Sequence, residues 1–509
     1  MTKHIFITGG VVSSLGKGIT SASLAMLLKN RGYRVAVQKF DPYLNVNPGT
    51  MSPFQHGEVF ITDDGVETDL DLGHYERFTG VPCSRTSSYT SGKIYKAVID
   101  REKAGGYGGG TVQIIPHVTD EIKADIRSAA GPEVDILVTE IGGTAGDIES
   151  HPHLEAIRQF RHEAGAGNVL FIHLTLVPYI KAAAELKTKP SQQSVAILRN
   201  IGIVPDVLVC RAEVPMDQEH RDKLALFCNV DKNMVIEELD VKNTIYEVPV
   251  ELARQQLDVK VLEALQLPVH RLDLAKWDDI IDRVINPERT CRIAVVGQNP
   301  AIRDAYKSVY EALAHAGIAA RAKVETIPVN AEDIEAGEAD LTGADAVLIP
   351  DGFGKQGAEG QIAAVKFARE NKIPFFGIGF GMHSMLHEAA VGSNLPAVVP
   401  PKHGTSRLGA FPCKLRPGSV AAKTYANAAE ISERHRRHDE IYADNAAALA
   451  AKGLTVSGTS PDGELVEIME LAGAPFFIGC QFHPEFKSRP DAPHPLFCGF
   501  VNATLAAKR

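Results

Sequence analysis

The chain has 509 residues, of which 44% are hydrophobic and 23% charged, a composition typical of a soluble globular protein with room for two domains. Its net charge of -10 comes without a basic block, which argues against binding to nucleic acid or to a membrane surface. Seven scattered cysteines with no C-x-x-C pair argue against a disulfide framework or structural zinc and favour a reducing cytoplasm. No signal-like leader or long apolar run is present, so we expect no membrane-spanning helix.

Short apolar runs alternate with helical patterns along the first half of the chain. The runs are Ile5–Ile7, Val35–Val37, Ile136–Val138, Leu170–Ile172 and Val207–Val209. This alternation predicts a parallel sheet covered by helices on both faces. The rhythm restarts at 292–297 and continues at 346–349 and 375–378. We therefore predict a doubly wound, P-loop-like α/β domain at 1–268, a linker at 269–290 and a second, flavodoxin-like α/β domain at 291–509.

A glycine-rich turn, Gly9–Gly18, joins the first predicted strand to a helix predicted from Ile19. Backbone N–H groups in such a turn bind phosphate oxygens, and Lys17 adds a positive charge. The turn departs from the standard P-loop, because Val11 stands at the first glycine position and Gly18 replaces the magnesium-binding Ser or Thr. The alternative is that these glycines only form a tight turn.

Carboxylates and lysines follow several other predicted strands. Asp71 and Glu140 provide the hard oxygen ligands that suit Mg²⁺ between phosphates, although either one alone is more typical of a solvated surface charge. Lys39 and the run Lys187–Gln192 concentrate positive charge in an acidic chain. The run is either surface solvation or a second anion-binding segment.

The segment Pro374–Met382 has the strand, sharp turn and helix that present a catalytic cysteine, but Gly379 stands at the turn. Downstream, His483 and Glu485 would supply the base and the orienting carboxylate for such a thiol. Without the thiolate no covalent glutamyl intermediate can form. The alternative is that a neighbouring cysteine serves, but neither Ser384 nor Cys480 is placed at the turn.

Several stretches closely resemble the CTP synthase family and cover most of residues 1–270: Gly9–Gly18, Asp41–Pro53, His56–Phe60, Asp69–Arg77, Glu140–Thr144, Gly146–Ser150 and Lys187–Gln192. The second half resembles, more loosely, the class I glutamine amidotransferase domain of that family. Its members use ATP to phosphorylate the C4 oxygen of UTP, and ammonia then displaces the phosphate to give CTP. The ammonia normally comes from glutamine, and GTP promotes that hydrolysis.

The resemblance implies a role for each matching residue, and it implies a homotetramer. Lys17 and Lys39 would be catalytic, and Asp71 and Glu140 would hold Mg²⁺. The implied ATP site comprises Ser13, Ser14, Leu15, Gly16, Lys17, Gly18, Ile19 and Asp71. The implied UTP site comprises Ser13, Asp147, Ile148, Glu149, Lys187, Thr188, Lys189, Gln192 and Lys223. His56 and Val59 would lie at the ammonia entrance.

The second half departs from the family pattern at its reactive positions. Gly379 replaces the nucleophile, and Asp351 stands where the family has an oxyanion-loop glycine, which puts negative charge where negative charge would develop. We therefore predict a degenerate, inactive glutaminase site comprising Gly379, His483, Glu485 and Asp351. In the first half, Gly109 and Gly110 replace larger side chains, which suggests either a larger amine or a more open passage.

Three functional hypotheses follow from the sequence. The leading one is an ATP-dependent ligase that aminates UTP, or a related uracil nucleotide, with free ammonia or a small amine. The second keeps the same activation but uses a different amine or a modified pyrimidine in a specialised pathway. The third is a catalytically silent paralogue that co-assembles with an authentic CTP synthase.

Overall fold

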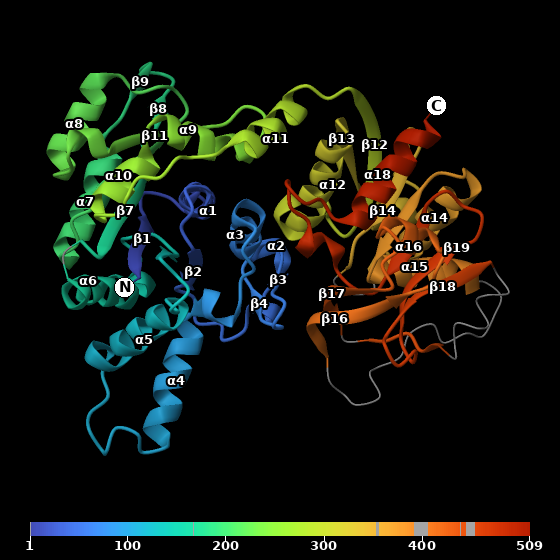
Figure 1. Cartoon of the computed structure of the whole chain (residues 1–509), viewed down its shortest axis with the longest axis horizontal. Coiled ribbons are helices and arrows are strands. Elements are labelled where there is room, and N and C mark those ends of the chain that lie inside the picture. Colours follow the sequence, from blue (N-terminus) through green and yellow to red (C-terminus); the bar gives the residue numbers. More distant parts are fainter. Residues whose placement is uncertain are drawn as a thin grey trace. The chain divides into compact units, whose positions relative to one another are not determined.

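The computed structural model describes residues 2–508 apart from 166, 353–355, 391–405, 438 and 444–452. The chain forms two compact units (Figure 1). Unit 1 comprises Met1–Thr50 and Asp71–Ile281, and unit 2 comprises Met51–Leu70 and Asp282–Arg509. Residues 51–70 therefore fold with the second unit although they lie within the first half of the sequence.

Unit 1 is built on a seven-stranded, all-parallel sheet in the order β11-β10-β7-β1-β6-β2-β5. The strands are β1 (Lys3–Gly9), β2 (Val35–Asp41), β5 (Ser88–Thr90), β6 (Ile136–Ile141), β7 (Val169–Leu176), β10 (Val207–Ala212) and β11 (Val235–Leu239). All five predicted apolar runs lie in these strands. The prediction of a parallel sheet is confirmed, because strands buried on both faces read as continuous apolar runs.

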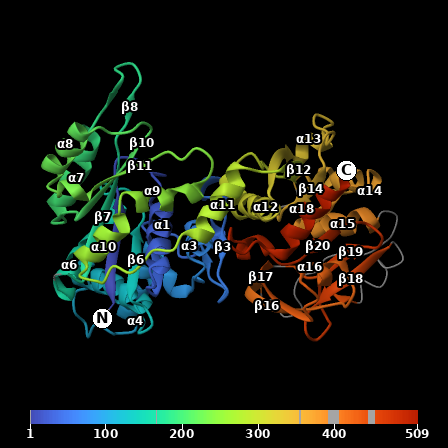
Figure 2. The same ribbon diagram turned by 45° about the horizontal axis from the view of Figure 1, so that its top comes forward.

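Helices cover both faces of this sheet (Figure 2). On one side α1 packs against α3, α9 and α10. On the other, side chains of α4, α5, α6 and α7 share one core cluster with Phe6 of β1 and Phe40 of β2. The helices of unit 1 are α1 (Lys17–Asn30), α3 (Asp71–Thr79), α4 (Ser91–Lys103), α5 (Thr119–Ala129), α6 (His151–Ala164), α7 (Lys189–Ile201), α8 (Gln218–Cys228), α9 (Val248–Arg254) and α10 (Leu257–Ala264), with α11 (Ala275–Ile285) at its end.

Unit 2 contains a nine-stranded mixed sheet in the order β13-β12-β14-β15-β20-β19-β18-β16-β17. The five strands β13, β12, β14, β15 and β20 are parallel to one another. From β20 onward, through β19, β18, β16 and β17, each neighbouring pair is antiparallel. The strands are β12 (Arg289–Gly297), β13 (Ala322–Asn330), β14 (Ala346–Ile349), β15 (Phe375–Ile378), β16 (Arg407–Leu415), β17 (Glu430–Arg437), β18 (Leu454–Thr459), β19 (Val466–Leu471) and β20 (Phe477–Cys480). The predicted α/β class is confirmed, and the antiparallel extension is a feature that the sequence did not predict.

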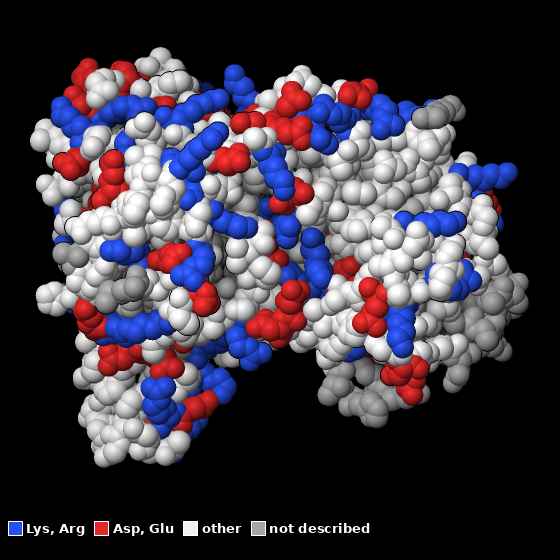
Figure 3. Space-filling view, viewed as in Figure 1, with Lys and Arg blue, Asp and Glu red and all other residues white. Residues whose placement is uncertain are grey.

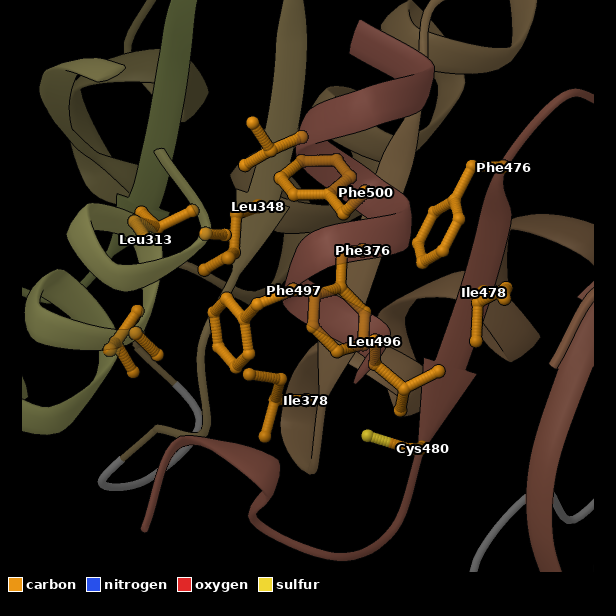
Figure 4. Close-up of a cluster of buried hydrophobic side chains, with 14 of the residues drawn as sticks. Leu313, Leu348, Phe376, Ile378, Phe476, Ile478, Cys480, Leu496, Phe497 and Phe500 are labelled. Carbon is orange, nitrogen blue, oxygen red and sulfur yellow. The ribbon is translucent and has the colours of Figure 1, made fainter. Parts of the chain in front are cut away.

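The core of unit 2 lies on both faces of its parallel strands. Phe376 of β15 packs against Phe497 and Phe500 of α18 (Pro495–Ala507), as Figure 4 shows. The preceding residue, Phe375, belongs to a separate cluster on the opposite face, because successive side chains of a strand alternate. The other helices of the unit are α12 (Lys307–Ala319), α13 (Ala331–Glu335), α14 (Ala358–Glu370), α15 (Phe380–Ala390) and α16 (Val420–Thr424).

The segment 51–70 is bound into unit 2 by ion pairs and a helix cap. It contains α2 (Pro53–His56) and a hairpin of β3 (Phe60–Ile61) with β4 (Glu67–Thr68). Asp63 pairs with Arg434 at 2.6 Å, and Glu67 pairs with Arg436 at 2.8 Å. The buried carboxylate of Glu58 accepts hydrogen bonds from the backbone N–H, at 2.7 Å, and the hydroxyl of Ser308 in the first turn of α12, where a negative charge stabilises the helix terminus.

On the face shown in Figure 3, basic and acidic side chains are interspersed. Among the described residues, no helix is both long and apolar enough to cross a bilayer.

Candidate functional sites

The glycine-rich turn of unit 1 joins the carboxyl end of β1 to the amino end of α1. The helix begins at Lys17, two residues before the predicted start. Val11, Ser14 and Gly16 have positive φ values of 79°, 54° and 104°, which fold the backbone sharply before the helix. Lys17 is held in place by a 2.7 Å hydrogen bond from its Nζ to the carbonyl of Gly143. The turn thus has the backbone and the lysine of a phosphate-binding loop.

The glycine at position 18 has a steric cause in this fold. A Cβ built there would lie 2.3 Å from Oδ1 of Asp71, so the Ser or Thr of a standard P-loop would fit only if the Asp71 side chain moved. The Asp71 carboxylate takes that space. The glycine at position 18 therefore leaves room for a carboxylate from α3 beside the turn.

A cluster of buried charges lies beside this turn at the carboxyl ends of the strands. Lys39 of β2 pairs with Asp41 at 3.1 Å and with Asp71 at 2.6 Å. Glu140 of β6 is adjacent to Lys39 in the strand register and accepts a hydrogen bond from the hydroxyl of Tyr75. Burial, and then the charge of Asp71, raises the pKa of Glu140 to about 7, and burial lowers the pKa of Lys17. A cation at this site would relieve the repulsion between the two carboxylates.

These residues fit Mg²⁺ shared with a nucleotide. Among the described residues, no group of three or more His, Cys, Asp or Glu side chains is arranged to hold a metal alone. Mg²⁺ in phosphate-transfer sites is typically bound through one or two carboxylates together with substrate phosphates. Asp71 lies close enough to Glu140 to raise the pKa of that carboxyl after burial has done so, and the two carboxylates match that arrangement.

The residues implied for UTP binding fall into two groups along α7. Lys187, Thr188, Lys189 and Gln192 lie at or before its amino end, where the amide of Gln192 donates to Thr188 Oγ1 at 3.1 Å. Ile148 and Glu149 border a surface cavity together with Ile201, at the opposite end of the same helix. A helix of this length spans roughly 20 Å. Lys223 lies on α8, and Asp147 accepts a hydrogen bond from the backbone N–H of Thr144 at 2.8 Å.

In unit 2, Gly379 occupies the sharp turn between β15 and α15. Its φ is 54°, and its N–H donates to the carbonyl of Cys480 at 2.8 Å. His483 follows β20, and its Nδ1 lies 2.8 Å from Oε1 of Glu485. The turn, the histidine and the carboxylate therefore have the arrangement of a nucleophile elbow with its base, and the nucleophile position carries a glycine.

Asp351 fills the space that a nucleophile's side chain would need. A Cβ at Gly379 would lie 2.1 Å from Asp351 Oδ1. The same oxygen accepts the backbone N–H of Phe380 at 2.8 Å and pairs with Arg437 Nη1 at 3.2 Å. The N–H after the nucleophile is one of the donors that an oxyanion would use. Asp351 therefore fills the space of the nucleophile's side chain, and it accepts a hydrogen bond from an N–H that an oxyanion would need.

Arg437 holds the Asp351 carboxylate in its charged form. Burial would raise the pKa of Asp351, but Arg437, followed by His483, Phe380 N–H and His383, brings it below the ordinary value. Burial, and then Arg437, lowers the pKa of His383 to about 3, so this histidine is neutral. Asp351 and Arg437 thus form a buried ion pair at the turn.

Other nucleophilic side chains near the turn are engaged elsewhere. The hydroxyl of Ser384 donates to Gln361 at 2.9 Å and to the Phe380 carbonyl at 3.0 Å. Cys480 lies on the adjacent strand β20, and burial raises the pKa of its thiol well above the ordinary value. A neutral, buried thiol is a poor nucleophile.

Sequence reasoning missed several residues that build these sites. Tyr75, Asp41 and Arg437 contact the predicted residues Glu140, Lys39 and Asp351. His56 and Val59, predicted at an ammonia entrance, lie on the segment of residues 51–70, His56 exposed and Val59 buried. The sequence around Tyr75 gives no signal for its contact with Glu140, since that contact depends on how α3 packs against the sheet.

Residues 3–267 match the family described as CTP synthase N-terminus, and residues 301–503 match glutamine amidotransferase class-I. A CTP synthase of Fibrobacter succinogenes is 58% identical over 532 residues, covering 100% of this chain and 94% of that protein. A CTP synthase of Pelotomaculum thermopropionicum is 52% identical over 534 residues, covering 100% of this chain and 99% of that protein. The solved structure titled Trypanosoma brucei CTPS glutaminase domain with bound acivicin is 30% identical with a TM-score of 0.40, covering 42% of this chain and 93% of that one.

The fold and the sites define a protein that combines a nucleotide-dependent ligase unit with a class I amidotransferase unit. The chain belongs to the CTP synthase family.

The contact between Gly18 and Asp71 can be tested by Gly18→Ala. The added Cβ would push Asp71 away from Lys39, so we expect ATP hydrolysis in the presence of UTP to fall by about 100-fold, the effect typical of displacing a positioned catalytic group. Gly131→Ala is the matched control, because a Cβ at Gly131 meets nothing within 4 Å. Equal rates for both variants would contradict the proposed role of Asp71.

The occupation of the nucleophile's space by Asp351 can be tested by placing a cysteine at the turn. The single variant Gly379→Cys is compared with the double variant that also carries Asp351→Gly. We expect iodoacetamide to modify the new thiol at least about tenfold more slowly in the single variant, because the Asp351 carboxylate blocks the thiol and disfavours its thiolate form. Peptide mapping by mass spectrometry follows this one site among the native cysteines. Equal alkylation rates would show that Asp351 does not obstruct the turn.

Proposed function

We propose that this protein is an ATP-dependent ligase that converts UTP to CTP with free ammonia as its nitrogen source. ATP would phosphorylate the C4 oxygen of UTP, and ammonia would then displace the phosphate. The observation that carries the proposal is the contrast between the two sites. Lys17, Lys39, Asp71 and Glu140 form a connected cluster at the phosphate-binding turn, whereas Asp351 lies where a glutaminase nucleophile would be.

Each member of the cluster has a role that its position supports. Lys17 and Lys39 would neutralise charge on the transferred phosphoryl group, and the backbone from Ser13 to Ile19 would hold the ATP phosphates. Asp71 and Glu140 would bind Mg²⁺, which would offset the negative charge of the phosphates. Phosphoryl transfer depends on positioning and charge neutralisation, so no covalent catalyst is required.

We propose that the protein works as a homotetramer in the cytoplasm. A surface cavity of about 780 Å³ in unit 1 is lined by apolar side chains, among which Ile148 is 75% exposed and Leu44 is 69% exposed. A patch of this kind favours contact with another protein surface. The two groups of UTP residues, one at the amino end of α7 and one beside its carboxyl end, are consistent with sites completed by a second copy. The seven cysteines, all described, form no disulfide, which suits a reducing compartment.

The nitrogen source is tested by product formation from UTP, ATP and Mg²⁺ with ammonium, glutamine or a panel of small amines. We expect CTP with ammonium and none above background with glutamine, read by mass spectrometry. A product of another mass from a single amine would instead support the hypothesis of a different nucleophile. No product with any donor, and no phosphate release from ATP with UTP present, would support a silent paralogue.

The apolar patch is tested by Ile99→Glu, which places a charge on the half-exposed face of α4 that borders the cavity. We expect the native mass, measured by light scattering, to fall below that of a tetramer, because burying an unpaired carboxylate costs several kcal/mol. Leu226→Glu, at an exposed position on α8 outside that cavity, is the control and should leave the mass unchanged. A tetramer in both variants would contradict the assigned contact surface.

A further inference from the structure

Unit 2 contains a small cavity beside the degenerate glutaminase turn. Its volume is about 40 Å³, close to the roughly 30 Å³ that one water molecule occupies in the liquid. Its polar lining comes from Glu58, Asp351, Arg436, His483 and Glu485, and its apolar walls from Val59, Ala305, Tyr306, Val309, Pro350 and Phe486. The cavity is of the size of a site for one small molecule.

Two residues of the cavity have buried acceptor atoms without a donor. His483 and Glu485 are 3% and 4% exposed. When the His483 ring is neutral, Nδ1 carries its proton because this nitrogen faces a carboxylate oxygen of Glu485, and Nε2 then has a lone pair. Nε2 of His483 and Oε2 of Glu485 have no hydrogen-bond partner among the described residues. A buried acceptor left in this state is costly unless a donor occupies the space beside it.

Asp351 adds a third acceptor. Its Oδ1 is engaged by Phe380 and Arg437, while its Oδ2 lies 3.6 Å from Nε2 of His483. Two acceptors at this separation repel each other unless a donor lies near both.

The charges around the cavity favour a cation. Glu58, Asp351 and Glu485 are carboxylates, and both oxygens of Glu58 already bind Ser308. Arg436 is the one guanidinium in the lining, and its Nε donates to Glu67 at 2.8 Å. When the partners Glu67 of Arg436 and Arg437 of Asp351 are counted as well, four carboxylates face two guanidinium groups, so negative charge predominates around the cavity.

We propose that this cavity binds one ammonium ion, a step that rests on the proposed use of free ammonia. Ammonium has four N–H donors and no acceptor, so it matches an unsatisfied acceptor set better than water, which brings two lone pairs of its own. Its size fits the cavity, whereas an amine with several carbon atoms does not. The degenerate turn would then select ammonia over larger amines.

The same geometry gives the ion a route to its reactive form. Ammonium has no lone pair and cannot attack an activated C4. One N–H bond breaks, the proton passes to Nε2 of His483, and the electron pair stays on nitrogen to leave NH₃ beside Val59. The resulting imidazolium lies between Glu485 and Asp351, which stabilise its charge, and its proton then passes to water.

The first test compares steady-state kinetics with ammonium for Asp351→Asn and Glu485→Gln. In either variant an amide replaces a carboxylate of nearly equal size, so we expect the KM for ammonium to rise about tenfold, the loss expected for one hydrogen bond to a charged group, with the KM for UTP and ATP unchanged. Glu388→Gln is the control, since Glu388 lies on α15 and pairs with the exposed Arg369. An unchanged KM for ammonium in both variants would overturn the proposal.

The second test measures binding without turnover. At equal ionic strength, ammonium chloride should raise the thermal midpoint of the native protein above its value in tetramethylammonium chloride, because a ligand of the folded state stabilises it, and Asp351→Asn should lose this difference. No difference for the native protein would overturn the ammonium site. A clear difference without any CTP from ammonium would leave the site standing and contradict the proposed function instead.

Discussion

Parallel pairing of strands is the constraint on which both sites depend. In unit 1, β1, β2 and β6 run in the same direction, so the glycine-rich turn, Lys39 and Glu140 converge at one edge of the sheet. In unit 2, β14, β15 and β20 do the same, which brings Asp351, Gly379 and His483 together. Residues up to about 130 positions apart in sequence become neighbours because the carboxyl ends of parallel strands open onto a common edge.

The two sites differ in how their buried charges are balanced. In unit 1, burial and then Asp71 disfavour the charged form of Glu140, and burial disfavours the charge on Lys17, so the cluster is suited to a bound cation and anion. In unit 2, the Asp351 carboxylate is matched by Arg437 and a backbone N–H. Removing one partner of such a buried pair costs about 3–5 kcal/mol, so Asp351 now stabilises the turn that it obstructs.

The segment 51–70 comes from the first half of the sequence but belongs to unit 2. Glu58 caps α12, and Asp63 and Glu67 pair with arginines of β17. Val59 lies between these anchors and borders the small cavity beside His483. The amidotransferase unit therefore has a structural role even without its nucleophile, because its residues hold in place a segment that lies within the first half of the sequence.

The sequence by itself determined the fold class, the phosphate-binding turn and the glycine at position 379, since these depend on apolar periodicity, local turn chemistry and residue identity. The sequence also indicated that Asp351 would oppose glutamine hydrolysis, but only the structure showed how close Asp351 lies to position 379. The reason for Gly18, the partners of Glu140 and Asp351, the unit to which 51–70 belongs and the acceptors of the small cavity were decided by tertiary packing. Contacts between side chains far apart in sequence leave no periodic signal, because they depend on how helices and strands settle against one another.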